Sequence, residues 1–273
     1  MAFPSSSLTS KNRRAIRSIS LPTRSHPTTL QVKEELANFK TWETSISCVP
    51  DAQTICSGVT ILDRLHTCVD NLLSLSLTQQ ALSHHQYQKL VDELRDRSMM
   101  LLDICGSVRD VVSHVKGHVR DVQSALRRRK NDFIIETSFL KKLMKDVKRG
   151  VADLKHLDYT YGSKPLNIDP HLSSVTRVLR DVSEISISFF GMLLSFFSVS
   201  ISKSKATKWS MITKFIQKGS GSNDQQQICV EALDCSIEGI ENGLECMFRK
   251  LIKTRASLLN ISHYCDFCNT ECC

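Results

Sequence analysis

The chain has 273 residues, of which 41% are hydrophobic, so it can bury one large core or two small ones. Ten Gly and six Pro are few for this length, which favours long uninterrupted helices over a sheet with many turns. The formal charge of +8 is unevenly placed, because residues 1–33 hold six basic and no acidic residues, whereas the remainder holds 30 basic and 28 acidic ones. Nucleic-acid binding normally needs a concentrated basic face, so a nearly neutral body argues against it.

The eleven cysteines would suggest disulfides in a secreted protein, but no apolar signal segment follows Met1. We therefore expect reduced thiols in a protein whose compartment the sequence leaves open, with the cytoplasm favoured over an organelle or a membrane. Five cysteines fall among apolar helical positions, where Cys acts as a small hydrophobe: Cys68, Cys105, Cys229, Cys235 and Cys246.

Residues 1–28 form a leader rich in Ser, Thr, Arg and Pro, which has too few large apolar groups to offset the entropy of ordering. The lack of acids is also typical of an organellar transit peptide, but no amphipathic helix accompanies it, so we favour a plain disordered leader. The leader contains the string RSISLP, with Arg17, Ser18, Ser20 and Pro22. These spacings match the RSxSxP pattern that 14-3-3 proteins bind once the second serine is phosphorylated, and they predict a phosphosite at Ser20.

A helical domain is predicted over residues 29–262, because apolar residues recur there at steps of three and four. The first two helices are marked by Val32, Leu36, Phe39 and Ile46, and then by Ile55, Val59, Leu62, Leu65, Val69, Leu72 and Leu73. Thr78 is expected to cap a short turn that begins at Gln79. The clearest pattern is a heptad stripe from Tyr87 through Leu101, Val108 and Val115 to Leu126, which predicts one helix of about 65 Å over 84–127.

The second half of the domain continues this pattern. A helix over 132–157 is expected to run antiparallel to the 84–127 helix, and the basic run at 127–149 is interpreted as its solvated surface. A connection containing Gly162, Pro165 and Pro170 then leads to a helix over 171–202, and a flexible linker is predicted at about 218–224. The last helix carries an apolar stripe from Val230 to Leu258. Together these segments predict an all-α bundle of long antiparallel amphipathic helices.

Residues 185–202 carry no charge and just meet the length of a membrane span, which keeps a membrane-associated protein open as the alternative reading. Six of these eighteen residues are serine, however, and a polar or small stripe runs along the segment from Arg177 to Ser202. We therefore favour a bundle helix whose two Phe pairs, Phe189 with Phe190 and Phe196 with Phe197, face the core.

The sequence holds none of the common nucleotide-binding, nucleophile-elbow or zinc-protease motifs, and we expect no enzymatic activity, cofactor or metal. Two patterns have the residue types of a metal site. One face of the 84–127 helix carries Asp110, His114, His118 and Asp121, which we interpret as solvated flank positions. The Cys-rich tail at 263–273 carries Cys265, Cys268, Cys272 and Cys273 beside His263; a mobile thiol-rich tail is favoured over a zinc site or acylated cysteines.

Several strings resemble a plant-specific helical family of unknown function that is often labelled BYPASS-related. They are RSISLPTRSHPTTLQVKEEL at 17–36, LDRLHTCVDNLLSLSLTQQALS at 62–83, VDELRDRSMMLLDICGSVRDVV at 91–112, VQSALRRRK at 122–130 and GLECMFRKLIKTRASLLNI at 243–261. The resemblance implies a plant protein with an all-helical fold and a link to root and shoot development. It carries over no catalytic residues, and the tail after His263 departs from the usual ending. We therefore predict a regulatory or scaffolding protein that acts through contacts with other proteins.

Overall fold

Five long or medium helices make up most of the computed structural model, which describes residues 26–46, 50–128, 169–201 and 223–270, with Lys145, Arg149 and Ala152 as isolated positions. The helices are α1 (Pro27–Ser45), α2 (Ala52–Leu73), α4 (Gln88–Arg127), α6 (Pro170–Ile201) and α8 (Asn223–Thr270). The short α3 (Ser76–Leu82) and the 3-10 turn η1 (His85–Tyr87) connect α2 to α4. No strand occurs among these described residues, so the all-α prediction is confirmed for them.

The helices begin where the sequence supplies capping groups. Asp51 accepts a hydrogen bond from the Thr54 N–H at 2.9 Å and so starts α2, and Asp169 accepts one from the His171 N–H at 2.9 Å and so starts α6. Proline occupies the first position of α1 and of α6, where its missing N–H costs nothing. The predicted cap at Thr78 is wrong: the N-cap of α3 is Leu75, and Thr78 is buried inside the helix with its hydroxyl 3.3 Å from His171 Nε2.

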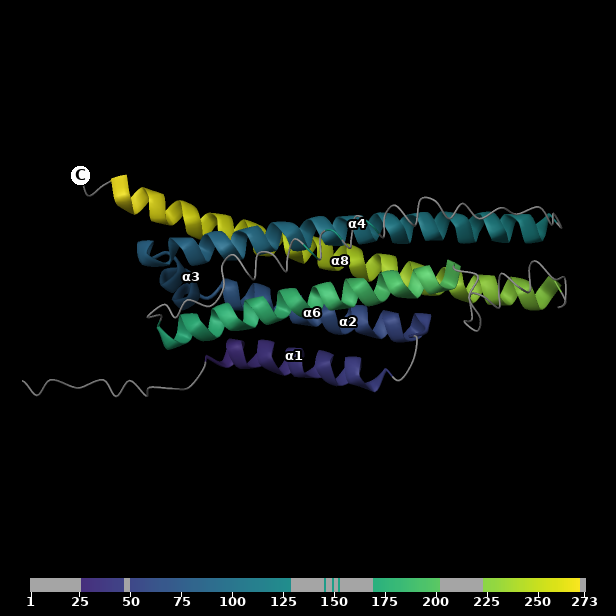
Figure 1. Cartoon of the computed structure of the whole chain (residues 1–273), viewed down its shortest axis with the longest axis horizontal. Helices are drawn as coiled ribbons and strands as arrows, with labels where there is room; N and C mark the ends of the chain where they lie inside the picture. The colour runs from purple at the N-terminus through teal and green to yellow at the C-terminus, as the bar shows by residue number, and fades with distance from the viewer. Residues whose placement is uncertain are drawn as a thin grey trace, which may run out of the picture.

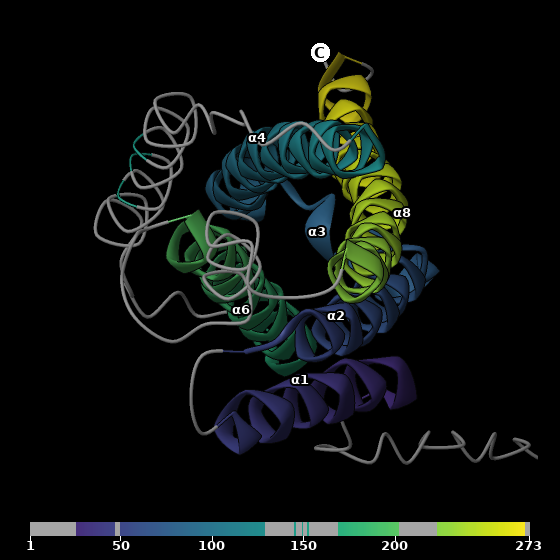
Figure 2. The ribbon, with the colours of Figure 1, turned by 90° about the vertical axis from the view of Figure 1, so that its right-hand side faces the viewer.

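Four helices surround the core, and the fifth lies outside them. Viewed along the bundle, α2, α4, α6 and α8 form a ring, and α1 packs on the outer side of α2 and α6 (Figure 2). The largest helix interfaces among the described elements are those that α8 makes with α4 and with α2. The last described helix, α8, therefore packs against both long helices of the core that come from the first half of the chain, α2 and α4.

Helix directions are mixed, as the colours of Figure 1 show. The α1, α4 and α6 helices run one way, and α2 and α8 run the other. Cross-helix contacts give the same result: residue numbers rise together from Cys56–Ser236 to Asp63–Lys250 between the parallel α2 and α8. Between α4 and α8 they change in opposite senses, from Arg109–Glu245 to Lys116–Glu241. By these directions α1–α2 and α4–α8 are antiparallel pairs, whereas α2–α8, α4–α6 and α1–α6 are parallel, so the antiparallel arrangement predicted for the whole bundle is not confirmed.

The predicted apolar stripes form the core. All seven apolar residues that marked α2 are buried, as are the eight from Val230 to Leu258 that marked α8 and both Phe pairs of α6. On the stripe that runs from Tyr87 of η1 to Val119 of α4 the side chains are buried, and α4 packs against α8 and α6. Among the stripe residues whose burial the structure describes, the exception is Ile46, which follows the end of α1 and is only half-buried. The expected antiparallel partner at 132–157 lies outside the described residues, apart from its three isolated positions.

Candidate functional site

Polar side chains from four helices meet in the middle of the bundle, and we call this group the polar core. The residues that carry the argument below are His66 and Asp70 of α2, Glu93, Arg97 and Ser98 of α4, Arg180, Ser183 and Ser186 of α6, and Thr254 of α8. Buried polar groups are costly unless they are hydrogen-bonded, so the partners of each one show what the polar core can do.

His66 is 1% exposed, and its Nε2 lies 3.0 Å from Ser186 Oγ. The single hydroxyl proton of Ser186 is donated to the Val182 carbonyl at 2.7 Å, so Nε2 must carry the proton that joins the two side chains. Nδ1 is then an unprotonated acceptor, and it has no hydrogen-bond partner within the described protein. Burial lowers the pKa of His66 from 6.5 to about 4, with a smaller contribution from Lys250, and the imidazole is neutral at physiological pH.

This geometry has the opposite polarity to a nucleophilic Ser–His pair. In such a pair the imidazole accepts the serine proton, and a third group orients the imidazole from its other nitrogen. Here the imidazole donates to Ser186, and its other nitrogen has no orienting carboxylate in the described structure. The pair therefore joins α2 to α6 and does not activate the hydroxyl.

Glu93 is a buried carboxylate held between two guanidinium groups. Arg97 Nε donates to it at 2.9 Å, and Arg180 donates to both of its oxygens, at 2.8 and 2.6 Å. Glu93 and Arg97 are each 3% exposed, whereas Arg180 is about one-third exposed. A charge-assisted, bidentate pair of this kind fixes the register of α6 against α4.

Three further polar contacts tie α2 to α8. Lys250 Nζ contacts Asp63 Oδ1 at 2.6 Å, and Lys253 Nζ contacts the largely buried Asp70 at 3.2 Å. The Thr254 hydroxyl donates to Asp70 Oδ1 at 3.4 Å. On both helices the residue numbers of these contacts rise in the same direction, so they set the parallel register of α2 and α8.

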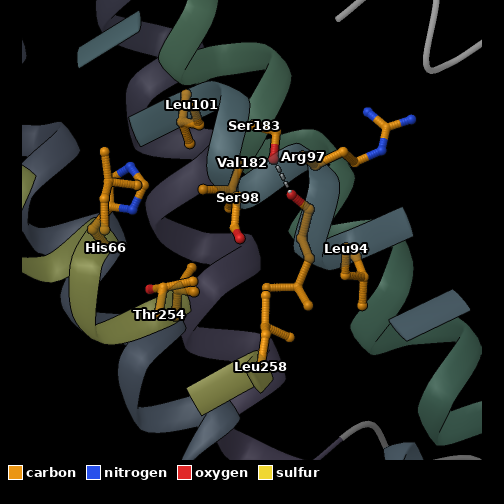
Figure 3. Close-up of a pocket in the computed structure, with 12 residues that line it drawn as sticks. His66, Leu94, Arg97, Ser98, Leu101, Val182, Ser183, Thr254 and Leu258 are labelled. Carbon is orange, nitrogen blue, oxygen red and sulfur yellow. Dashed lines mark hydrogen bonds between the residues drawn. The ribbon is translucent and has the colours of Figure 1, made fainter. Parts of the chain in front are cut away.

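A cavity of about 30 Å³ lies inside the polar core and is lined by residues of α2, α4, α6 and α8. Figure 3 shows His66 and Thr254 at one edge of the group of lining residues, while the guanidinium of Arg97 points away from the others. Ser98 and Ser183 also line it, and its remaining walls are apolar: Val69, Leu94, Leu101, Leu179, Val182, Leu251 and Leu258. Small-molecule sites are about 300–1,000 Å³, so this cavity has the size of one or two water molecules.

The site residues that the sequence predicted do not meet here. The motif of Arg17, Ser18, Ser20 and Pro22 lies outside the described residues, and so do Cys272 and Cys273. Cys265 and Cys268 belong to the last turns of α8, of which only the backbone is described. The expectation that internal cysteines are small core residues holds for Cys105 but is wrong for the exposed Cys235 and Cys246, and Cys68 is half-buried. Burial raises the pKa of Cys105 to about 12, which makes it an unreactive thiol.

The histidine face of α4 is open to solvent at its described positions. His114 is exposed, and its Nδ1 lies 2.8 Å from the Asp110 carbonyl oxygen. Within the described part of the chain, no three His, Cys, Asp or Glu side chains are grouped so that they could hold a metal ion. None of the described helices has the length and apolar character needed to cross a membrane. In α6 the Phe pairs are buried, and Arg177, Glu184, Ser188 and Ser195 of the polar stripe are exposed.

Sequence reasoning missed most of the polar core. Glu93 and Arg97 are four residues apart beside the heptad stripe, and charged residues so close to a buried face are a signal for an internal ion pair. His66 falls between the stripe residues Leu65 and Val69, and that position indicated burial. Their partners on α6 and α8 are distant in sequence, so no local pattern indicated them.

The fold and the polar core together define an all-α bundle whose long helices are held in register by internal ion pairs and hydrogen bonds. The chain belongs to the family described as Protein BPS1, which matches residues 58–261. The match begins at Gly58 in the first half of α2 and ends at Ile261 of α8, and it confirms the BYPASS-related resemblance. No curated protein and no solved structure matches the chain.

Proposed function

We propose that the protein is a non-enzymatic regulatory or scaffolding protein that acts through contacts with other proteins, in the root and shoot development to which its family points. The observation that carries this proposal is the long paired framework of α4 and α8. With 40 and 48 residues, these helices span about 60 and 72 Å at 1.5 Å per residue. They give the bundle an extended surface on which partner proteins can dock.

The interior chemistry supports the same proposal. The buried charges of the polar core are paired within the bundle, where they fix helix register, and the cavity beside them has the volume of water and not of a metabolite. These contacts support a structural role for the polar core, and the regulatory function that we propose then depends on the surface of the protein.

The partner that we propose first is a 14-3-3 protein, bound through the leader after phosphorylation of Ser20. Arg17 lies three residues before Ser20, as basophilic kinases require, and Pro22 turns the chain after the phosphate. A phosphoserine adds about −1.5 to −2 charge and three acceptor oxygens that Arg side chains in the partner groove can bind bidentately.

Proximity labelling with the full chain in plant cells tests the general proposal, and we expect a reproducible set of protein neighbours. A labelled set no different from that of a free biotin ligase would contradict it. For the 14-3-3 contact, we expect Ser20→Ala to abolish co-purification of 14-3-3 proteins, while Ser10→Ala in the same leader leaves it unchanged. Peptides spanning residues 12–27, with and without phosphate on Ser20, separate the two cases in vitro, because equal weak binding of both would exclude the phosphate-dependent contact.

A further inference from the structure

The α1 helix lies outside the ring that α2, α4, α6 and α8 form, and its main described contacts are with α2 and α6 (Figure 2). The four ring helices contact one another without it. The family match begins at Gly58, so it also leaves α1 out. Most of the stability of a protein helix comes from its packed apolar face, so α1 depends on the surface to which it is bound.

The surface that binds α1 has a slot for an indole ring. We call this surface the α1-binding face, and it comprises Ser57, Gly58 and Arg64 of α2 and Ser188 and Phe189 of α6. The Trp42 ring lies against the bare backbone of Gly58, where a Cβ would overlap it, and 6.0 Å from the Phe189 ring. Trp42 Nε1 donates a hydrogen bond to Ser57 Oγ at 3.1 Å. The face therefore accepts both the flat ring and its N–H group.

Two acidic side chains of α1 contact the edges of the same face. Glu35 pairs with Arg64 at 3.5 Å, and Glu43 Oε1 accepts a hydrogen bond from the Ser188 hydroxyl at 2.9 Å. Arg64 and Ser188 are exposed, so these contacts orient the helix more than they add affinity. The buried apolar side chains of α1 follow at steps of four and three: Val32, Leu36 and Phe39.

One residue of α1 fits this environment poorly. Thr29 is fully buried, and its Oγ1 has no hydrogen-bond partner within the described protein. Such a hydroxyl opposes docking, because it loses its hydrogen bonds to water when the helix binds and gains none in return. A helix with Val at this position avoids that loss. The α1-binding face can therefore hold another helix more tightly than it holds α1.

We propose that the α1-binding face is a docking site for an amphipathic helix of a partner protein, and that α1 is its exchangeable intramolecular occupant. The spacing on α1 defines the partner helix: apolar residues at i, i+4 and i+7, Trp at i+10, and acidic residues at i+3 and i+11. This inference rests on the proposed function, because it names the chemistry of one protein contact. While α1 is bound, the site is closed, so α1 and the partner helix compete for it.

The test measures whether a helix added in trans replaces α1. The probe is a fluorescent peptide of residues 26–46, titrated by anisotropy into the full chain carrying Trp42→Ala, whose own α1 has lost its largest contacting side chain. We expect this variant to bind the peptide about tenfold tighter than the wild-type chain does. A peptide with Thr29→Val should bind about fivefold tighter than the unchanged peptide.

Two further variants of the full chain are controls. Leu30→Ala, which changes an exposed residue of α1, should bind the peptide no better than the wild type does. The double variant Trp42→Ala with Gly58→Ala keeps α1 weakened but fills the slot, so it should lose the peptide. Equal binding to the wild type and Trp42→Ala, full binding to the double variant, or no gain from Thr29→Val would each overturn the proposal.

Hydrogen exchange of the wild-type chain gives a readout that does not depend on variants. The amides of α1 should exchange faster than those of α2 and α6, because α1 can leave while the ring stays folded. Exchange of α1 only together with the ring would contradict the proposal, and so would a stable dimer that swaps α1, since the site would then belong to a second copy. If these tests fail while proximity labelling still finds a reproducible set of neighbours, the docking site is excluded and the proposed function stands.

Discussion

Two ionisable side chains in the polar core are buried to the same degree but are accommodated in opposite ways. The Glu93 carboxylate accepts charge-assisted hydrogen bonds from Arg97 and Arg180. The His66 imidazole is neutral, because burial lowers its pKa to about 4, and Ser186 lies within hydrogen-bond distance of the neutral ring. The lowered pKa of His66 therefore links the stability of the bundle to acidity.

We expect the free energy of unfolding to fall as the pH drops from 6.5 towards 4. The folded-state pKa of His66 lies below the unfolded value of 6.5, so in this range the unfolded chain binds a proton that the folded chain excludes. The stabilisation is complete above pH 6.5 and decreases by about 2 kcal/mol at pH 5, as 1.36 kcal/mol per pKa unit implies. Urea denaturation of the wild type and of His66→Gln at pH 7, 6 and 5 measures the difference.

The control for this prediction is His114→Gln, which alters an exposed histidine on the neighbouring α4. Its pH profile should follow that of the wild type, whereas the profile of His66→Gln should be flatter. Superimposable profiles for the wild type and His66→Gln would show that His66 titrates normally in the folded state.

At the scale of single residues, the sequence predicted burial better than it predicted chemistry. The stripes identified the buried apolar residues, since a period of three and four marks one face of a helix. They did not separate Cys105 from Cys235 and Cys246, because a Cys beside a stripe can point towards or away from the core. His66 was predictable as a buried position, but its neutral state depends on Ser186, which is 120 residues away.

At the scale of the elements, two glycines set how closely α2 approaches its neighbours. A Cβ built on Gly58 would lie 2.5 Å from Trp42 Cζ2 of α1 and 2.7 Å from Phe189 Cε2 of α6. A Cβ built on Gly243 of α8 would overlap Val59 Cγ1 of α2. These helices can pack at their present separation only because neither position carries a side chain.

We expect Gly58→Ala and Gly243→Ala each to destabilise the protein by about 1–3 kcal/mol, the usual cost of overpacking a core. The matched control is Gly117→Ala on α4, where no heavy atom lies within 4 Å of the added Cβ. That change should stabilise the protein by roughly 0.5–1 kcal/mol, because Ala favours a helix over Gly. Thermal or urea unfolding of the three variants provides the measurement, and equal effects at all three positions would contradict the close approach.

The heptad stripe of α4 gives a second prediction for an element. Val115 is buried, so Val115→Asp places a carboxylate in the core and should lower the thermal midpoint sharply, with a cost of several kcal/mol unless it binds a proton. Ser113→Asp adds the same group to the exposed side of the same turn and should have little effect. An unchanged midpoint for Val115→Asp would mean that the stripe does not form the core.

Lys116→Ala looks like a neutral control from the sequence, but the structure corrects that expectation. Lys116 is largely buried and pairs with Glu241 of α8 at 2.5 Å. Periodicity identified the buried face of α4, yet it did not identify the partner helix, because the next predicted helix in the chain was an equally good candidate. The charge pattern could have indicated α8 as the partner helix of α4. Acidic residues on α8 at positions 231, 234, 238, 241 and 245 recur at steps of three and four beside its apolar stripe.

At the scale of the whole molecule, the α4–α8 interface is a seam of basic side chains on one helix and acidic side chains on the other. Arg109, Lys116, Arg120 and Arg127 of α4 pair with Glu245, Glu241, Asp234 and Glu231 of α8. Exposed ion pairs contribute only about 0–1 kcal/mol each, so the seam specifies orientation and register more than it adds stability. Reversal of α8 would place these acids beside the wrong residues of α4.

We expect a double-mutant cycle of Lys116→Glu and Glu241→Lys to show a favourable coupling of about 1 kcal/mol. Each single change places two like charges together at this partly buried pair, and the double change restores an opposite pair in the same place. Urea denaturation of the four proteins at low and high salt measures the coupling, which should shrink as salt screens it. A double variant no more stable than the sum of its single changes would exclude the pairing.

The position of α8 in the chain has a consequence for how the protein is made. Asp63 and Lys250, which join α2 to α8, are 187 residues apart, and Arg109 and Glu245, which join α4 to α8, are 136 apart. At about 5–20 residues per second, a ribosome that has finished α4 needs on the order of ten seconds to deliver the stretch of α8 that covers it. Until then the nascent chain displays the apolar stripes of α2 and α4 without their largest interface. The core of this protein therefore closes only late in translation, and the nascent chain is a natural client for chaperones during that interval.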